Sequence, residues 1–523
     1  MKSDYSKSLY EDYQKLLIEN EKLKKQNAEL KYKRALDLKV IFSLQKENEI
    51  LKNDKNKISK EFGDTLQELS NSNNKIGSLQ SILNNDASNS GISTEKTSIN
   101  KKKRIPNSRV KSDKKKGGQL GHTKAKLEKF SDDEITNIED HIPQSCKFCS
   151  NLNIVPTGKV IEKDELDYEI MVKKTRHKFY EYICNDCNKK FCLPIPNNLK
   201  EDNQYGPKIQ SLILLLSNEG NMPINKIKRT IEGITDGQIN PCGGYISKLQ
   251  ERAYENLKDF EDELIKNVIQ EKLIYWDDTV INVDTKRACL RFYGTDKLAL
   301  YKAHENKDKK GLDEDKILTV LDKNKTVMHD HNMINYNKCY SFSNIECNVH
   351  LIRDLQKNSD NSGHEWSKKL KALLSDANAK RNELISKNIS SFEQEYLDKF
   401  FMQFDIIMRD AIDEKNSDDK WFKSNEQTLI LRILKYRENY LAWVANFDLP
   451  FTNNLSERSL RDSKSKMKIS GQFENINSAK KYARIKSYIE TCHRNSINEY
   501  SAINKLSLKK PLSVKEILNG QIN

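Results

Sequence analysis

The chain has 523 residues, and its 90 Lys and Arg against 76 Asp and Glu give a net charge of +14. This length exceeds what a single ordinary hydrophobic core supports, so we expect several domains. No run of about 18 apolar residues and no signal-peptide pattern occurs, which excludes a membrane-spanning class and predicts a soluble intracellular protein.

The positive charge indicates the kind of binding partner, and the cysteines indicate bound metal. A net positive charge favours a polyanionic partner, but the chain is rich in Lys and Asn throughout, so the clustering of the charge is more informative than its total. Ten cysteines in an intracellular chain indicate metal ligands and free thiols rather than disulfides.

A heptad repeat runs through residues 1–70, which contain no proline. Leucine at the d positions with asparagine at several a positions predicts a parallel two-stranded coiled coil, and therefore a homodimer or a higher oligomer. The alternative is a solitary amphipathic helix, which the narrow apolar stripe disfavours. The d positions are Leu9, Leu16, Leu23, Leu30, Leu44, Leu51 and Ile58, broken only by Asp37.

Residues 71–125 are rich in Ser, Asn and Lys and predict a flexible basic linker. Such an arm can follow DNA phosphates and add affinity that does not depend on the base sequence. The alternative is a solvated linker without a binding role. The candidate DNA-binding residues of this arm are Lys102, Lys103, Arg104, Lys114, Lys115 and Lys116.

Two Cys-x-x-Cys pairs within residues 126–200 predict a zinc ribbon. Each pair can present two thiolates, and two pairs complete a tetrahedral site with no open position, so the Zn²⁺ is expected to be structural. The residues between the pairs alternate like strands around Tyr168 and Phe179. The expected ligands are Cys146, Cys149, Cys184 and Cys187, with Cys192 and His141 as spare candidates.

Residues 201–265 predict short helices separated by glycine turns, either as a helix-turn-helix or as plain helical packing. Then the pattern changes to strands, and a long helical region follows to about residue 446. The strands are expected over 272–284, 288–294, 298–303, 317–322 and 326–330.

Three carboxylates come from two predicted strands and a predicted helix. Asp277 and Asp278 face opposite sides of the first strand, so only one can enter a shared site. Asp330 ends the last strand, and Glu457 lies in the first turn of a helix that begins near Leu455. Carboxylates from two strands and a helix can hold two Mg²⁺ (or Mn²⁺) ions for phosphodiester chemistry, and without cations their mutual repulsion must shift their pKa values.

These motifs resemble those of transposases of the insertion sequence 66 family. The resemblance covers Asp277-Asp278-Thr279, Asp330 upstream of Cys347-x-x-His350, and the Asn-Asn-x-x-Glu-Arg motif that ends at Arg458. It implies a ribonuclease H-like α/β catalytic domain over 266–490, with a helical insertion at about 351–446 and a helical tail over 491–523. The implied catalytic and metal-binding triad is Asp277, Asp330 and Glu457. The chain departs from the family pattern at Thr452 and at His331-Asn332, none of which is an implied ligand.

The resemblance implies a DNA transposase, nucleoid-associated in a bacterial-type cytoplasm. It would cleave the ends of its insertion sequence with water and join the freed 3′-hydroxyl to target DNA. Small accessory proteins of the same element are further candidate partners. The alternatives are a non-catalytic DNA-binding regulator and a ribonuclease H-like nuclease without strand transfer. Arg458, Arg461 and Lys464, on the helix of Glu457, are the expected DNA contacts next to the cleavage point.

Overall fold

The computed structural model describes residues 9–23, 76, 79, 128–196, 199, 201–417 and 422–520. The chain divides into two units, which we treat separately. The larger unit consists of 103–356, 364–413 and 429–523, and the smaller one of 1–102, 357–363 and 414–428. The three carboxylates of the expected triad all belong to the larger unit.

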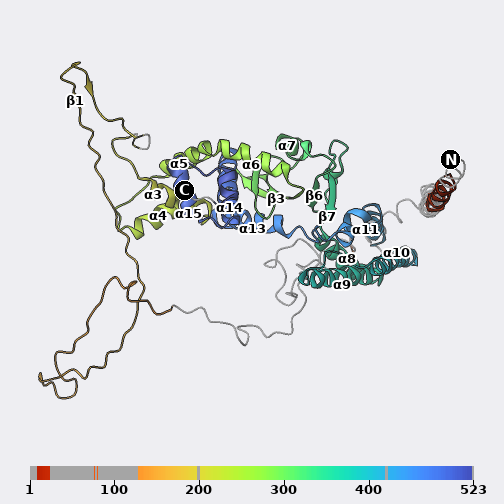
Figure 1. Cartoon of the computed structure of the whole chain (residues 1–523), viewed down its shortest axis with the longest axis horizontal. Helices are drawn as coiled ribbons and strands as arrows, with labels where there is room; N and C mark the ends of the chain where they lie inside the picture. The colour runs from red at the N-terminus through yellow and green to blue at the C-terminus, as the bar shows by residue number, and fades with distance from the viewer. Residues whose placement is uncertain are drawn as a thin grey trace, which may run out of the picture. The chain divides into compact units, whose positions relative to one another are not determined.

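A five-stranded mixed sheet with the order β5-β4-β3-β6-β7 lies at the centre of the larger unit (Figure 1). Its first three strands form an antiparallel meander, and β6 and β7 continue the sheet parallel to β3. The β3–β4 hairpin turns at Asp284 and Thr285, which both have positive φ, as the tight hairpin turns require. The strands are β3 (Leu273–Val283), β4 (Lys286–Gly294), β5 (Ala299–His304), β6 (Thr326–His329) and β7 (Ser343–Glu346).

Four of the five predicted strands are confirmed, and the prediction for 317–322 is wrong. That stretch contains the 3-10 helix η2 (Leu318–Val320) instead, and it follows the short helix α7 (Lys309–Glu314). Ile317 and Leu318 are fully buried in the core while Val320 is exposed, so packing overrides the strand propensity of the apolar run. The sequence analysis did not predict β7, which is four residues long and carries Ser343, Asn344 and Glu346.

The two faces of the sheet carry different helices. Even-numbered apolar residues of β3, such as Ile274 and Trp276, share a core with α6 (Lys258–Gln270). Odd-numbered residues, such as Ile281, share another core with α13 (Asn454–Ser470). The helix that was expected near Leu455 is therefore confirmed, and it lies on the face toward which Asp277 points by strand parity.

Helix α14 (Ile476–Arg494) runs along β5, the outer strand of the meander. Its side chains supply acceptors to the strand: Ser487 Oγ accepts from the Tyr301 amide at 2.8 Å, and Thr491 Oγ1 accepts from the Ala299 amide at 3.2 Å. A sheet edge that would otherwise expose unpaired amides is closed in this way.

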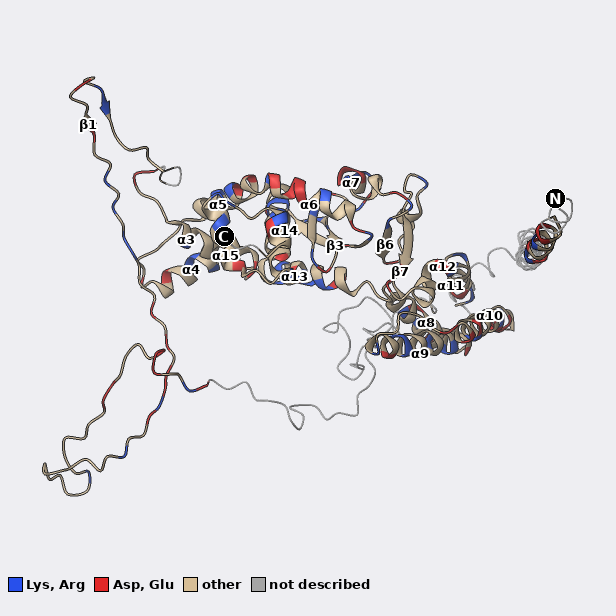
Figure 2. Ribbon diagram, in the orientation of Figure 1, with Lys and Arg blue, Asp and Glu red and all other residues tan. Residues whose placement is uncertain are grey.

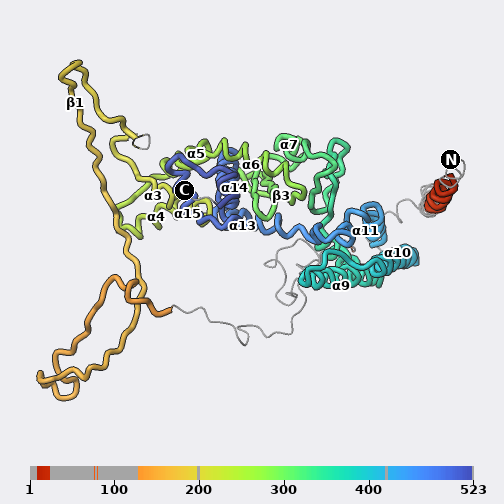
Figure 3. The backbone as a smooth tube through the Cα atoms, in the orientation of Figure 1, coloured from red at the N-terminus to blue at the C-terminus, as the bar shows by residue number. Residues whose placement is uncertain are grey.

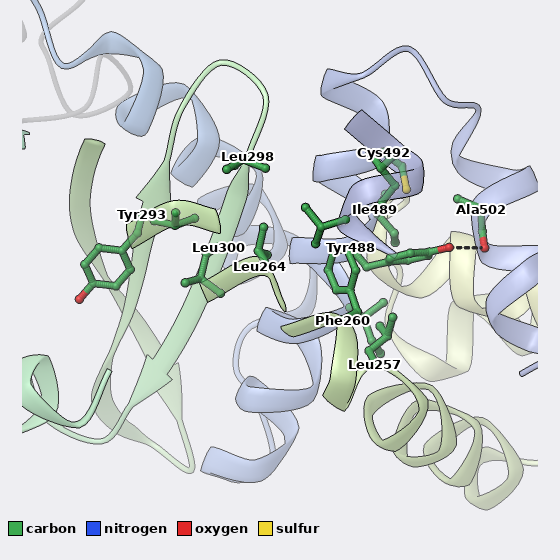
Figure 4. Close-up of a cluster of buried hydrophobic side chains, with 14 of the residues drawn as sticks. Leu257, Phe260, Leu264, Tyr293, Leu298, Leu300, Tyr488, Ile489, Cys492 and Ala502 are labelled. Atoms are coloured by element: carbon green, nitrogen blue, oxygen red, sulfur yellow. Dashed lines mark hydrogen bonds between the residues drawn. The ribbon is translucent and has the colours of Figure 1, made fainter. Parts of the chain in front are cut away.

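Helices that are far apart in the sequence of the larger unit, such as those near residues 210 and 500, pack side by side (Figure 3). Figure 4 shows part of their common core, in which Phe260 and Tyr488 meet edge to face with ring centroids 5.0 Å apart. The Tyr488 hydroxyl donates to the Ala502 carbonyl at 3.0 Å. The helices around this core, besides α6 and α14, are α3 (Pro207–Asn218), α4 (Ile224–Ile234), α5 (Gly243–Asn256), α15 (Glu499–Ser507) and α16 (Val514–Leu518). The short helices that were expected within 201–265 are therefore present.

Helices also fill the interval between β7 and α13. Their core within the larger unit is aromatic: Trp366, Phe400, Phe404 and Trp443 are all at most 2% exposed. Within the larger unit, α12 packs against β7 at the parallel side of the sheet. The helices are α8 (Asn348–Ser362), α9 (Trp366–Ser386), α10 (Gln394–Ser417), α11 (Lys423–Lys435) and α12 (Arg437–Ala445).

The N-terminal predictions fall largely outside the described residues. Residues 9–23 form a helix whose leucines at the d positions are exposed, and the rest of the heptad lies outside the described part. Within 128–196 the structure contains the two-residue strands β1 (Tyr182–Ile183) and β2 (Lys190–Phe191) but no strand at Tyr168, whose side chain is exposed. None of the described helices is both long and apolar enough to cross a membrane.

Candidate functional site

Asp277 and Asp330 meet through the register of adjacent parallel strands. Tyr275 of β3 lies opposite Met328 of β6, so two residues further along the register Asp277 comes opposite Asp330. Residues that are paired in this way point to the same face of a sheet. Because β6 ends at His329, the Asp330 side chain emerges directly at the end of its strand.

Asp278 points to the other face of β3. Its carboxylate lies 2.5 Å from Lys307 Nζ, and its side chain is only 7% exposed. The geometry therefore agrees with the expectation that only one of the two adjacent aspartates enters a shared site.

Glu457 reaches the same place from the first turn of α13, and His350 from the first turn of α8. His350 Nδ1 lies 3.1 Å from Asp330 Oδ1 and 3.8 Å from Glu457 Oε1. Cys347, three residues before His350, joins the group: one potential ligand atom from each of these four residues lies within 4.8 Å of the others.

Asp277, Asp330 and His350 all have shifted pKa values at this site. Burial, and then the negative charge of Asp330, raises the pKa of Asp277 to about 8. Burial also raises the pKa of Asp330, but His350 and Asn453 outweigh it and hold that pKa below its ordinary value. Burial lowers the pKa of His350, but Asp330 and Cys347 outweigh it and raise the pKa to about 11. The imidazolium and one protonated carboxyl thus balance a cluster that repels itself, as the sequence analysis expected.

Asn453 connects the elements that carry the acids. Its side-chain amide donates to the Trp276 carbonyl, next to Asp277, at 2.9 Å, and its backbone amide donates to Cys347 Sγ at 3.2 Å. Its own carbonyl accepts from the Glu457 amide at 3.2 Å. Asn453 is the N-cap residue of α13 and is fully buried, yet its side chain makes no capping bond. The Asn453 side chain therefore bridges strand and helix and does not cap the helix.

A second polar network holds the turn after Asp330. Glu346 of β7 is fully buried and accepts from Tyr336 Oη at 2.5 Å, and His331 Nδ1 lies 2.8 Å from its carboxylate. Such a buried carboxylate is kept in place by its partners. Sequence reasoning missed this network because nothing in the local pattern distinguishes Glu346 from a surface glutamate.

The structure describes the basic residues expected on α13 but not those expected in the basic arm. Arg458, Arg461 and Lys464 are exposed along α13, where Figure 2 shows the Lys and Arg positions. The arm residues Lys102, Lys103, Arg104, Lys114, Lys115 and Lys116 lie outside the described residues.

The two Cys-x-x-Cys turns have the same backbone geometry. Cys146 donates its amide to the Asn151 carbonyl at 2.8 Å, and Cys184 donates to the Lys189 carbonyl at 3.0 Å. Backbone amides of the following residues, led by Phe148 in the first turn and by Cys187 in the second, lower the pKa values of the Cys146 and Cys184 thiols. Each turn is thus suited to a thiolate, although the structure does not bring the four sulfur atoms into one cluster among the described residues.

The carboxylate group fits the divalent cations that its chemistry implies. Oδ1 of Asp330 and Oε1 of Glu457 are buried, and the His350 ring lies 3.1 Å from the first and 3.8 Å from the second as their neighbouring cation. A buried carboxylate is costly without a cation beside it. Hard carboxylate oxygens that converge from β3, β6 and α13 are the ligand type that Mg²⁺ and Mn²⁺ prefer. Asp277, Asp330 and Glu457 are the residues that would hold them.

The site thus lies on a mixed α/β core, where carboxylates from two strands and a helix come together. A family model described as "Transposase IS66 family" matches residues 202–481. That match covers more than half of the 523 residues, so the chain belongs to this transposase family. No curated protein matches the sequence.

Proposed function

We propose that the chain is a catalytically active DNA transposase that cleaves the ends of its insertion sequence and joins them to target DNA. The observation that carries this proposal is the convergence of Asp277, Asp330 and Glu457 from three separate elements, with the pKa of Asp277 raised by burial and by neighbouring carboxylates, Asp330 above all. A sheet in which two parallel strands extend an antiparallel meander supports the ribonuclease H-like assignment.

The three carboxylates act as the metal ligands of the reaction. Divalent cations held there would supply Lewis-acid activation of the attacking hydroxyl and charge stabilisation at the leaving oxygen of the phosphodiester. Asp277 would hold such a cation as a carboxylate, without its proton. Arg458, Arg461 and Lys464 contact phosphates beside the scissile bond, and Asn453 holds β3 and α13 in register.

The remaining parts of the chain assemble the DNA complex. Four thiolates from the two Cys-x-x-Cys turns hold one structural Zn²⁺, and the similar turns at Cys146 and Cys184 support this. The heptad region pairs two chains and the basic arm binds DNA, which would bring two element ends together. Accessory proteins of the same element are candidate partners.

The test is incubation of the full chain with DNA of its element ends, with Mg²⁺ or EDTA. We expect Mg²⁺-dependent nicking at the ends and, with target DNA added, joined products. Binding without cleavage would instead favour the alternative of a non-catalytic DNA-binding regulator. Cleavage without joining would favour a nuclease without strand transfer.

A further inference from the structure

Two residues beside the carboxylates give the site a second set of donor atoms. Cys347 follows β7 directly, and His350 lies in the first turn of α8. The spacing of three residues puts both on one side of the chain. One donor atom each from Asp330, Cys347, His350 and Glu457 lies within 4.8 Å of the others. Ligands of a tetrahedral zinc ion lie about 3.3–3.8 Å apart, given bonds of about 2.0–2.3 Å. A contraction of about 1 Å, within the reach of side-chain rotations, closes the group around one ion.

The polar atoms of this group are buried together. Asp330 Oδ1, His350 Nδ1 and Glu457 Oε1 are each shielded from solvent. His350 Nδ1 forms an ion pair with Asp330 Oδ1 at 3.1 Å and lies 3.8 Å from Glu457 Oε1. Two carboxylate oxygens and a ring nitrogen that lie this close together can act as ligands of one cation.

The kind of cation follows from the donor atoms. Mg²⁺ takes oxygen ligands, whereas a thiolate and an imidazole select thiophilic transition metals, above all Zn²⁺. Asp277 contributes no atom to this group, and Cys347 and His350 are not expected to bind Mg²⁺. The two ligand sets therefore differ in character but share Asp330 and Glu457.

We propose that Asp330, Cys347, His350 and Glu457 form a site for a single thiophilic transition-metal ion, Zn²⁺ in particular, which excludes Mg²⁺ from the two shared carboxylates. Binding releases the proton of the Cys347 thiol and that of the His350 imidazolium to solvent, as coordination requires. Cys347 Sγ is already fixed, because it accepts the Asn453 amide at 3.2 Å and its residue is 1% exposed. Metal binding itself is independent of any DNA reaction. Only its consequence, inhibition of cleavage by Zn²⁺, rests on the proposed function.

Cobalt spectroscopy on the full chain tests the site, because Co²⁺ replaces Zn²⁺ and its bond to a thiolate gives a charge-transfer band in the near ultraviolet. We expect Cys347→Ser and His350→Ala each to bind one equivalent of Co²⁺ fewer than the unmodified chain. Cys347→Ser also loses the band of one thiolate. Cys339→Ser removes an exposed thiol outside the group and serves as the matched control, with stoichiometry and spectrum unchanged. Counting the difference in equivalents separates this site from any metal held by the Cys-x-x-Cys turns.

The proposal is overturned if Cys347→Ser and His350→Ala bind as much Co²⁺ as the unmodified chain with the same spectrum. Circular dichroism shows whether each variant is folded. Should Cys347→Ser be unfolded, His350→Asn decides instead, because it removes a ligand that only this group uses and is expected to lose the same equivalent. If the variants lose one equivalent of Co²⁺ but the unmodified chain cleaves no DNA with Mg²⁺, the metal site stands and the proposed function fails.

Discussion

Asn453 is the residue whose contacts connect most of the candidate site. It bridges Trp276, Cys347 and the first turn of α13, while Asn454 beside it is exposed. We expect Asn453→Ala to lower the free energy of unfolding by about 1–3 kcal/mol, because the buried Trp276 carbonyl loses its donor. We further expect cleavage to fall by about 100-fold, because the carboxylates shift relative to one another.

Asn454→Ala is the matched control for that prediction, since it makes the same change one residue away. It should leave the denaturation midpoint and the cleavage rate unchanged. Equal effects of the two substitutions, measured by urea denaturation and single-turnover cleavage, would show that Asn453 has no connecting role.

The individual residues differ in how far the sequence predicts them. The parity of β3 separated Asp277 from Asp278 in advance, because alternation along a strand is a local property. The roles of Lys307, Glu346 and Asn453 were not predictable, since each depends on a partner that is remote in the sequence. The Cys-x-x-His spacing was visible, but its closeness to Glu457 is a result of tertiary folding.

At the scale of an element, α13 carries Glu457 in its first turn and exposed basic residues further along the helix. Lys464 stands seven residues after Glu457, which is close to two turns. We expect Lys464→Ala to weaken binding of end DNA and to lower the slope of log K against log salt concentration by about 1, the effect of one lost phosphate contact. Filter binding at several salt concentrations measures this slope.

Lys399→Ala on α10 removes the same charge from an exposed position that pairs with Glu395, and it serves as the control. Its slope should equal that of the unmodified chain. An unaltered slope for Lys464→Ala would show that Lys464 is a solvated surface residue that contacts no phosphate.

Helix α14 stabilises the sheet edge through two hydroxyl groups. Ser487→Ala leaves the buried Tyr301 amide without an acceptor, so we expect a loss of about 1–3 kcal/mol in the free energy of unfolding. Ser465→Ala on the exposed side of α13 should change it by less than about 0.5 kcal/mol. Equal denaturation midpoints for the two variants would contradict the edge-closing role of α14.

The elements themselves were predicted well where their periodicity is long. Helix α13 and strand β3 have long amphipathic or alternating patterns, whereas β7 has four residues and three of them are polar. The mistaken strand at 317–322 shows that an apolar run without clear alternation does not distinguish a buried turn from a strand.

For the whole molecule, the heptad predicts that the chain acts as a dimer. The leucines at 9, 16 and 23 are exposed on the described helix, which leaves an apolar seam for a second chain. We expect the full chain to sediment as a dimer or larger, and a variant lacking residues 1–70 to lose this association. The same molecular mass per particle for both proteins in analytical ultracentrifugation would exclude the predicted zipper.

The central claim is that Asp277, Asp330 and Glu457 act as one metal-binding unit in DNA cleavage. The most direct measurement compares Mg²⁺-dependent cleavage of end DNA by Asp277→Asn, Asp330→Asn, Glu457→Gln and the matched control Asp278→Asn. We expect the first three to reduce cleavage to background with end binding intact, and double variants to be no worse than single ones. Asp278→Asn should stay within about tenfold of the unmodified chain, because it disturbs only the ion pair with Lys307. Loss of cleavage in Asp278→Asn together with full activity in Asp277→Asn would contradict the account.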